Sequence, residues 1–295
     1  MQNVEELFDT IRQISQPFKS FQFWFIRKWT GTHNNCTFDV LDKESHTILY
    51  PDIDFSSSTF LESVPGEVLI DYEKFKQRPE YQIGLPVDLS DRSPEYLKTI
   101  YQMLLVGIDM IRRYNKKQDP DVCNHYEAVL NWLESGDFYY APASTHFHES
   151  YKGGLLFHTL NVYNECCRLW TLDKFRSVSC DSFALVCLIH DWCKIGLYAS
   201  YTRNVKDDST GQWHKEIAYK WSDNGPAFPF GHGATSMFLA SRFFNLSVEE
   251  SLAIRWHMGW CNVADNESND LQSANERYPL VHLVQFADQL SIVSY

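Results

Sequence analysis

The sequence lacks the features that mark a membrane protein or a disulfide-stabilised secreted protein. No apolar run approaches the roughly 18–20 residues that a membrane-spanning helix requires. The polar, acidic start MQNVEELFDTIRQ predicts a helix rather than a signal peptide. None of the eight cysteines forms a CxxC pair, which argues against a zinc ribbon and a thioredoxin-like motif. Several cysteines fall in apolar helical patterns, which indicates free thiols, so we expect a cytoplasmic protein.

Clustered basic residues are also missing. The chain has 26 Lys and Arg against 38 Asp and Glu, for a formal net charge of −12. A general duplex-binding surface needs grouped Lys and Arg to displace counterions, so duplex DNA is not the expected partner. A small phosphorylated molecule or a single-stranded nucleic-acid end fits better, with metal ions supplying positive charge. The sequence leaves the oligomeric state open.

The pattern of residues changes along the chain and predicts two domains. These are a small N-terminal α+β or β module over residues 1–90 and a helical domain over 91–295. The chain has 295 residues, which is long enough for a large core. In the module, residues 1–16 predict a short helix. Runs rich in aromatic and β-branched residues then predict strands, at 21–29, 36–42, 46–50 and 66–72. Because aromatic strands usually pack inward, we expect them to form the module's own core, with a base-stacking platform as the alternative.

The second domain carries clear helix signals. A Ser-Pro-Glu run at 93–95 supplies an N-cap, a first-turn proline and an acidic residue. A Gly-Gly pair at 153–154 starts a later helix, and Ser247 with Glu250 forms a capping box. Two β-like runs flank DDSTGQ, which predicts a hairpin within residues 200–222. The expected fold is therefore mainly α, a helical bundle with an inserted β-hairpin.

Six side chains that can bind a divalent metal recur through the helical domain, in the segments GGLLFHT, HDWCK, GHG, RWHMG and FADQL. Imidazole and carboxylate together suit Mn, Fe, Zn, Ni or Co, so these ligands do not select one metal. A lone histidine on an apolar helix is more often a core residue than a ligand, but this ordered series keeps ligand types and helical context together. Six groups exceed the needs of one ion and predict a two-metal site. The candidates are His158, His190, Asp191, His232, His257 and Asp288.

This series resembles the HD-domain metal-dependent phosphohydrolase superfamily over roughly residues 140–295. That family's signature is a His, a His-Asp pair, further histidines in binuclear members and a final Asp, all on a helical bundle. The resemblance implies two divalent ions (Mn, Fe, Ni, Co, Zn or Mg), with His232 and His257 as the additional pair of two-metal members. Lys194, at the HDxxK position, is similar to the family's phosphate-contacting lysine.

Two segments resemble particular branches of the family. HFHESYKGGLLFHT looks like HD-type bacterial 3′-to-5′ exoribonucleases and HD domains attached to DNA-processing proteins, and GHGATSMFLASRFF looks like bacterial HD hydrolases of undetermined function. The chain departs from the family pattern in two places. Trp192-Cys193 stands where a small apolar pair is usual, and ADQLS stands where ADxLA is commoner. Neither departure is expected to touch a ligand.

The ligand types dictate the chemistry. Two cations held by imidazoles and carboxylates lower the pKa of a bridging water and neutralise phosphate oxygens during an in-line displacement. Asp191, as the bridging carboxylate, and Lys194, as a phosphate contact, are then the expected catalytic residues. Lys194 would lie one helical turn beyond His190, and therefore on the same face as it.

Four further residues are candidate substrate contacts. His146 and His148 precede the first ligand and could contact phosphate or protonate a leaving group, although ordinary loop histidines are an equal alternative. Arg203 and Lys206 on the hairpin could close over the substrate. Charged hairpin residues are more often simply solvated.

We therefore expect an enzyme, a divalent-metal phosphohydrolase acting on a nucleotide or a single-stranded oligonucleotide by a metal-activated hydroxide. A nucleotidase or dNTP hydrolase competes with a 3′-to-5′ exonuclease or cyclic-nucleotide phosphodiesterase. The acidic charge favours small substrates, whereas the GGLLFHT resemblance and the aromatic β module favour an oligonucleotide. Two alternatives are a non-catalytic regulatory HD protein that binds metal or nucleotide, and a purely structural helical protein with buried histidines.

Overall fold

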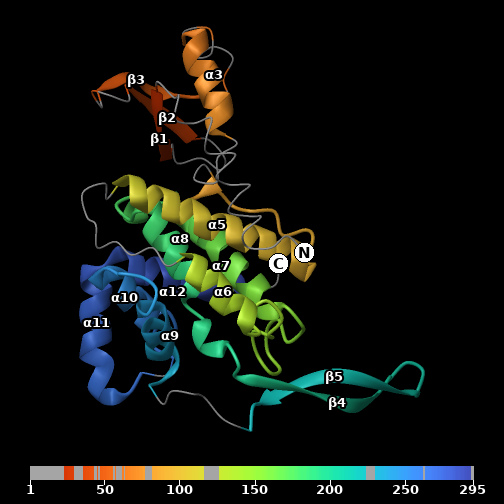
Figure 1. Cartoon of the computed structure of the whole chain (residues 1–295). Helices are drawn as coiled ribbons and strands as arrows, with labels where there is room; N and C mark the ends of the chain where they lie inside the picture. Colours follow the sequence, from red (N-terminus) through yellow and green to blue (C-terminus); the bar gives the residue numbers. More distant parts are fainter. Residues whose placement is uncertain are drawn as a thin grey trace.

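The protein is mainly helical, as the sequence predicts, with a small sheet and a long hairpin as its β elements (Figure 1). Within the residues described below, no helix has both the length and the apolar character needed to cross a membrane. The helix expected in residues 1–16 lies outside them. The computed structural model describes residues 23–29, 36–42, 45, 47–55, 57, 62, 64–76, 82–115, 126–223, 230–261 and 263–293.

The N-terminal region forms a three-stranded antiparallel sheet in the order β1-β2-β3. β1 (Phe23–Trp29) pairs along its whole length with β2 (Cys36–Asp42). β3 (Ile48–Ile53) pairs with the other edge of β2. The first three predicted strands are therefore confirmed.

The fourth predicted strand is wrong, because residues 66–72 belong to a helix, α3 (Gly66–Phe75). The run GEVLIDY suggested a strand through its residue types, but a short apolar run does not by itself distinguish a strand from a helix. The buried side chains recur three or four residues apart, as on one face of a helix: Val68, Asp71, Tyr72 and Phe75.

Aromatic side chains fill the space between this sheet and α3. Phe25 and Phe38 of the sheet lie against Tyr72 and Phe75 of α3, with ring centroids 5.2–6.2 Å apart. All four side chains are buried. These aromatics form the module's own core, so they do not offer a platform for stacking bases.

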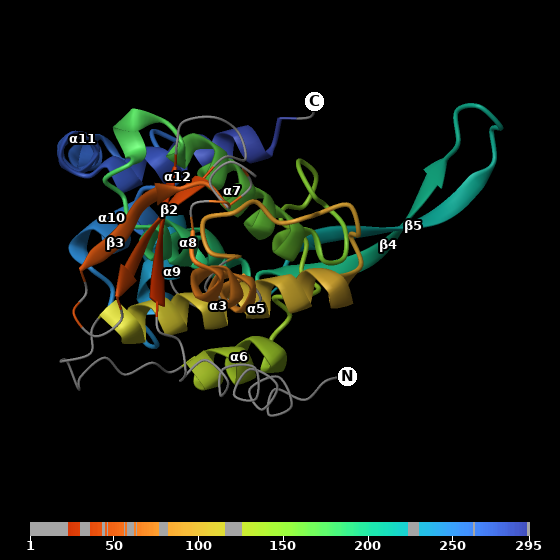
Figure 2. The same ribbon diagram turned by 90° about the horizontal axis from the view of Figure 1, so that it is seen from above.

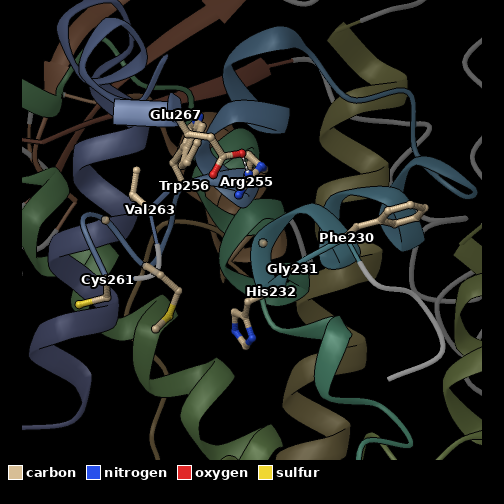
Figure 3. Close-up of a pocket in the computed structure, with 11 residues that line it drawn as sticks. Phe230, Gly231, His232, Arg255, Trp256, Cys261, Val263 and Glu267 are labelled. Carbon is tan, nitrogen blue, oxygen red and sulfur yellow. Dashed lines mark hydrogen bonds and ion pairs between the residues drawn. The ribbon is translucent and has the colours of Figure 1, made fainter. Parts of the chain in front are cut away.

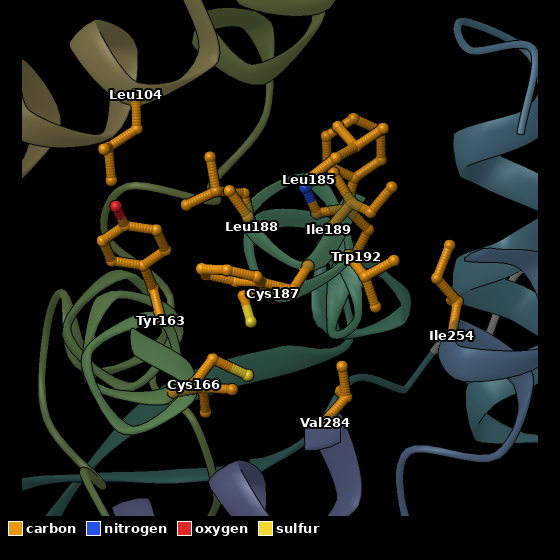
Figure 4. Packing of buried hydrophobic residues seen from close by; sticks show 14 of the residues in the cluster. Leu104, Tyr163, Cys166, Leu185, Cys187, Leu188, Ile189, Trp192, Ile254 and Val284 are labelled. Carbon is orange, nitrogen blue, oxygen red and sulfur yellow. The ribbon is translucent and has the colours of Figure 1, made fainter. Parts of the chain in front are cut away.

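The helical body is organised around α8 (Cys180–Ile189), whose side chains from Phe183 to Ile189 are all buried. Side chains of α8 interleave with those of the surrounding helices in Figure 4. Burial on every side explains why the run FALVCLI has no polar face. The helices packed against α8 are α5 (Pro94–Asn115), α7 (Gly154–Trp170), α10 (Val248–Arg255) and α12 (Pro279–Ser291).

Three more helices complete the described body: α6 (Tyr126–Ser135), α9 (His232–Ser241) and α11 (Ser268–Arg277). The sequence pattern does not predict α11, because the residues of this helix are mostly polar and only Leu271 and Ala274 are buried. The predicted capping box is confirmed at the start of α10. The Glu250 N–H donates to Ser247 Oγ at 3.2 Å, and the Ser247 N–H donates to Glu250 Oε2 at 2.8 Å.

A buried set of charges ties three of these helices together. Arg112 of α5 donates from Nε to Asp181 Oδ2 at 3.0 Å and from Nη2 to Glu250 Oε1. Ser182 Oγ donates to the same Glu250 oxygen at 2.7 Å. The side chains of Arg112, Asp181 and Glu250, called the charge cluster below, are all buried. Asp181 is in the first turn of α8 and Glu250 is in the first turn of α10.

The predicted hairpin is also confirmed. β4 (Tyr198–Lys206) pairs with β5 (Trp213–Trp221) in antiparallel register, with Tyr198 opposite Trp221. Asp207 closes the turn by accepting the N–H groups of Ser209 and Thr210. Figures 1 and 2 show the hairpin extending away from the helices. The end of the hairpin at Tyr198 and Trp221 lies next to the helices, and the turn at Asp207 lies far from them.

Buried hydrophobic side chains fall into two clusters, one within residues 25–75 and one within residues 83–287. The larger cluster contains α8 and the helices around it, including the N-terminal part of α5 from Leu97 onward. The division of the chain into domains at residue 90 stays a prediction.

Candidate metal centre

The six predicted ligands come together in the interior of the helical body. We call His158, His190, Asp191, His232, His257 and Asp288 the histidine cluster. Two groups of three residues in this cluster have one donor atom from each residue within 4.8 Å of one another: His158, His190 and Asp288, and His190, Asp191 and His257. Asp191 and His232 form a third such group with Cys193. His158, His190, Asp191 and His257 are buried, and the side chain of His232 is 26% exposed.

Two glycines explain how α7 delivers His158. Gly153 adopts a φ of +85°, in the left-handed region that favours glycine, at the N-cap of α7. A Cβ on Gly154 would overlap the carbonyl oxygen of Glu149. The segment GGLLFHT therefore starts the helix in close contact with the preceding loop, and His158 follows one turn later on the buried side.

The His-Asp pair lies at a break between helices. α8 ends at Ile189, His190 is its C-cap, and Asp191 is the N-cap of a short 3-10 turn, η3 (Trp192–Lys194). The expectation that Lys194 lies one α-helical turn beyond His190 is therefore wrong, because the backbone tightens there. In a 3-10 turn, residues three apart eclipse, and Lys194 Nζ lies 2.7 Å from Asp191 Oδ2.

A third glycine brings the start of α9 close to the end of α10. A Cβ on Gly233 would overlap the carbonyl oxygen of Arg255. The segment GHG thus allows His232, the first residue of α9, to approach His257, which follows α10, with ring centroids 5.1 Å apart. His257 in turn lies 4.9 Å from the ring of His190.

Backbone carbonyls fix the tautomers of two histidines. His190 Nδ1 lies 2.7 Å from the Cys187 carbonyl oxygen, and His257 Nδ1 lies 2.8 Å from the Ile254 carbonyl oxygen. A carbonyl only accepts, so each Nδ1 carries the proton. In the neutral ring each Nε2 is then an acceptor, and both are buried without a hydrogen-bond partner among the described residues.

A hydroxyl fixes His158 in the same way. Ser291 Oγ donates to the Asp288 carbonyl oxygen at 2.7 Å, so it accepts from His158 Nδ1 at 3.3 Å. His158 Nε2 then points toward carboxylates, 3.2 Å from Asp288 Oδ1 and 3.4 Å from Asp191 Oδ2. Hydrogen bonding of the remote ring nitrogen is how proteins orient metal-binding histidines.

Asp191 presents its two oxygens to different groups. Oδ2 faces Lys194, His158 and His190, the last with its Nε2 at 3.5 Å. Oδ1 faces His232 Nε2 at 2.8 Å and His257 Nε2 at 3.6 Å. This division fits a carboxylate shared between two ion positions.

The electrostatics favour anionic carboxylates in this interior. Burial alone would raise the pKa of Asp191, but Lys194 and the histidines hold it well below its usual value. The hydrogen bond and charge of His158 lower the pKa of Asp288 in the same way, against the effect of burial. Burial lowers the pKa of His158, yet hydrogen bonds to Asp191 and Asp288 outweigh it and raise that pKa to about 9. A proton or a metal cation bound between these nitrogens and oxygens is therefore stabilised by the anionic carboxylates.

The donor set fits a divalent metal. Nitrogen and oxygen ligands about 2.0–2.2 Å from one ion lie roughly 3–3.5 Å apart. The His158–Asp288, His158–Asp191 and His190–Asp191 separations of 3.2–3.5 Å match that spacing. These buried histidines and aspartates could therefore hold a metal ion.

The two loop histidines differ in their position. The ring of His148 lies 4.9 Å from the ring of His158, and His148 and Glu149 form a further group of possible donors with His158. Burial and the nearby charges of His158 and Lys194 lower the pKa of His148 to about 4. His146 is exposed. Only His148 of this pair is placed beside the cluster.

The structure does not bring the two hairpin cations to the cluster. Arg203 Nη2 lies 3.4 Å from Glu216 Oε1 on the neighbouring strand, and both side chains are exposed. Lys206 is exposed at the far end of β4. At the start of β4, burial raises the pKa of Tyr198, and the charges of Lys194 and Asp191 also act on it.

Sequence reasoning missed two residues that contact the ligands. Cys193 Sγ lies 3.3 Å from His232 Nδ1, and Ser291 Oγ contacts His158. Both belong to the segments that depart from the HD pattern, so the expectation that these segments do not touch a ligand is wrong. The departures themselves were the signal that could have identified these contacts.

A pocket of about 280 Å³ opens beside His232. Its upper wall in Figure 3 contains Trp256 and Arg255, with the Arg255 guanidinium 4.1 Å from the Trp256 ring and Nη2 2.6 Å from Glu267 Oε1. The pocket mixes apolar and polar walls and has His232 in common with the histidine cluster. The remaining lining residues are Phe230, Gly231, Gly233, Met258, Gly259, Cys261 and Val263.

Comparison with known proteins adds no relative. No family model matches the chain, and no curated protein or solved structure matches it.

Proposed function

We propose that the protein is a divalent-metal-dependent phosphohydrolase of the HD type, which cleaves a phosphoester of a nucleotide or of a single-stranded oligonucleotide. The observation that carries this proposal is the pair of buried Nε2 acceptors of His190 and His257, which face carboxylate oxygens with no hydrogen-bond partner in the described structure. Two lone-pair donors facing anionic oxygens in a buried site are stabilised by a cation.

The cluster offers ligands for two ions that share Asp191. His158, His190 and Asp288 would hold one ion with Oδ2, and His232 and His257 would hold the other with Oδ1. Bound there, a pair of divalent ions supplies Lewis acidity and lowers the pKa of a bound water toward 7. The donor types permit Mn, Fe, Co, Ni or Zn, with Mg the poorest match to imidazole.

Lys194 and His148 are suited to act on the substrate. Burial lowers the pKa of Lys194, but Asp191 outweighs it and raises that pKa, so the ammonium stays charged and can hold a phosphoryl oxygen. His148 is neutral near pH 7 because its pKa is about 4, and its Nε2 is buried without a hydrogen-bond partner among the described residues. In the proposed reaction Lys194 binds the phosphate and His148 accepts a hydrogen bond near the leaving group.

The pocket beside His232 is suited to the organic part of the substrate. Trp256 and Phe230 provide aromatic surface, and Arg255 provides a donor. A base stacked on an aromatic ring gains about 1–3 kcal/mol. The net charge of −12 and the lack of clustered Lys and Arg in the sequence favour a short or small substrate over a long duplex.

The test combines metal analysis with a phosphoester screen. Purified protein should contain Mn, Fe, Co, Ni or Zn, or take it up after chelation, and should then hydrolyse a nucleotide or a labelled oligonucleotide. Phosphate release identifies a nucleotidase, whereas ladder products on single-stranded RNA or DNA identify an exonuclease. Bound metal without hydrolysis of any phosphoester would instead support a regulatory protein, and no metal under any condition would support a structural one.

A further inference from the structure

A thiol lies at the edge of the histidine cluster, at a position where the resemblance to HD proteins assigns no ligand. Cys193 Sγ is 3.3 Å from His232 Nδ1 and 3.6 Å from His232 Nε2. Asp191, Cys193 and His232 form one of the groups whose donor atoms all lie within 4.8 Å of each other. The donor set on this side of Asp191 therefore includes sulfur as well as nitrogen and oxygen.

The backbone holds this thiol against α9. The Cys193 N–H donates to Ser236 Oγ at 3.0 Å, and Ser236 is fully buried. Ser236 is one turn after His232 on α9, so both residues are on the same face of that helix. The contact between Cys193 and His232 thus follows from the packing of η3 on α9.

The separation between the sulfur and the His232 ring matches two ligands of a common ion. A sulfur about 2.3 Å and a nitrogen about 2.0–2.1 Å from one zinc ion lie roughly 3.5 Å apart. The measured Sγ–Nε2 separation is 3.6 Å, and the same Nε2 lies 2.8 Å from Asp191 Oδ1. His257 adds a buried Nε2 that has no hydrogen-bond partner in the described part of the chain and lies 3.6 Å from that carboxylate oxygen.

We propose that Cys193 is a metal ligand, and that its thiolate binds one of the two ions together with Asp191 and His232. Imidazole, carboxylate and thiolate are the ligands of zinc sites, whereas carboxylate and water suit Mg²⁺ and Mn²⁺. The two positions of the centre therefore differ, and the one beside Cys193 selects Zn²⁺ or a zinc-like ion such as Co²⁺. On binding, the S–H bond breaks, its proton passes to solvent, and the sulfur lone pair binds the ion without electron transfer.

This assignment rests on the metal centre of the proposed function, but not on the hydrolytic reaction. A thiol that only forms a weak hydrogen bond with His232 would give the same distances without metal. The two arrangements are distinguished by the spectrum of the bound ion and by the reactivity of the thiol.

The first experiment uses Co²⁺ as the probe. After chelation, the full-length protein is titrated with Co²⁺ and its absorption spectrum is recorded. The wild type should show a near-ultraviolet thiolate-to-cobalt charge-transfer band. Cys193→Ser should lose this band, and Cys261→Ser, which alters an exposed cysteine in the neighbouring pocket, should keep it. A band that survives in Cys193→Ser overturns the assignment.

The second experiment compares metals. Competition with a chelating dye should show a loss of Zn²⁺ affinity of at least about 10-fold in Cys193→Ser, and a clearly smaller loss of Mn²⁺ affinity. Equal losses for Zn²⁺ and Mn²⁺, or no loss for either, contradict a thiolate ligand. Far-ultraviolet circular dichroism verifies that the variant folds.

The third experiment needs no substitution. Wild-type protein is alkylated with and without Zn²⁺, and the modified cysteines are mapped by mass spectrometry. Zn²⁺ should protect Cys193 and leave Cys261 reactive. Alkylation of Cys193 at the same rate in zinc-loaded protein overturns the assignment, even if Cys193→Ser fails to fold.

These outcomes separate the two proposals. If the wild type binds no metal, the metal centre and the thiolate ligand both fail. If metal binds but the cobalt band and the zinc protection are absent, only the assignment of Cys193 fails. If both signals are present while no phosphoester is hydrolysed, the thiolate ligand stands and the proposed hydrolysis fails.

Discussion

The two ends of α8 carry buried polar clusters of opposite kinds. At the N-terminal end, Arg112 lies between Asp181 and Glu250, so protein atoms compensate the carboxylates. At the C-terminal end, His190 and His257 present to Asp191 ring nitrogens that have no hydrogen-bond partner among the described residues. Each cluster joins α8 to α10, the first at their starts and the second just past their ends.

The difference supports the proposed division of roles, in which one cluster stabilises the fold and the other could hold a metal ion. In a buried ion pair with both partners present, each charge is compensated by protein atoms, and removal of one partner destabilises the fold. Buried acceptors that face anions cost free energy unless a cation binds. We therefore assign the charge cluster to stability and the histidine cluster to metal binding, and the predictions below test that division.

The largest effect is expected from Asp191→Asn. Loss of the shared carboxylate should remove metal from both positions and lower phosphoester hydrolysis on the order of 10⁴-fold, as for other central catalytic groups. Metal per chain, measured by plasma mass spectrometry, and initial rates test this. Asp207→Asn, in the hairpin turn, is the control and should change neither quantity. Full metal content in Asp191→Asn would show that Asp191 is not a ligand.

Arg112→Ala should be next in size and act on stability alone. It leaves Asp181 and Glu250 buried without their cation, which costs about 3–5 kcal/mol of unfolding free energy. Urea denaturation measures this, and the fraction that remains folded should bind metal normally. Arg176→Ala removes an exposed pair with Asp173 and should cost less than about 1 kcal/mol. Equal costs for the two variants would remove the distinction between the clusters.

Metal should stabilise the fold through the histidine cluster. At a free ion concentration about 100 times the dissociation constant, binding to the native state adds about 2.7 kcal/mol, seen as a rise in melting temperature that a chelator reverses. His257→Gln should lose most of this rise. His282→Gln, which alters a half-buried histidine of α12 outside the cluster, should keep it. A rise that is equal in both variants would contradict ligation by His257.

The smallest effect is expected from Ser291→Ala. The Ser291 hydroxyl orients His158 by accepting its Nδ1–H, and loss of such an orienting contact typically lowers metal affinity by about 10-fold or more. Chelator competition measures this change, while urea stability without metal should change little. Ser241→Ala, on an exposed part of α9, is the control. Unchanged affinity would show that the packing of α7 alone orients the ring.

Much of the helical body could be predicted from local signals. The capping box at Ser247, the Gly-Gly start of α7 and the hairpin around DDSTGQ all depend on contacts within a few residues. The error at α3 has a different cause, since the apolar residues of GEVLIDY permit either structure and burial against Phe25 and Phe38 favours the helix. Only contacts with β1 and β2 provide that information.

The sequence by itself determined the donor types of the site, their order along the chain and most of the helices that carry them. The tertiary structure alone decided how these donors are arranged. The end of α8 at Ile189 sets the tautomer of His190, and contacts across 43 and 133 residues bring Ser236 to Cys193 and Ser291 to His158. Local composition dictates caps and turns, whereas the direction in which a ring nitrogen or a carboxylate oxygen points depends on partners that only folding brings together.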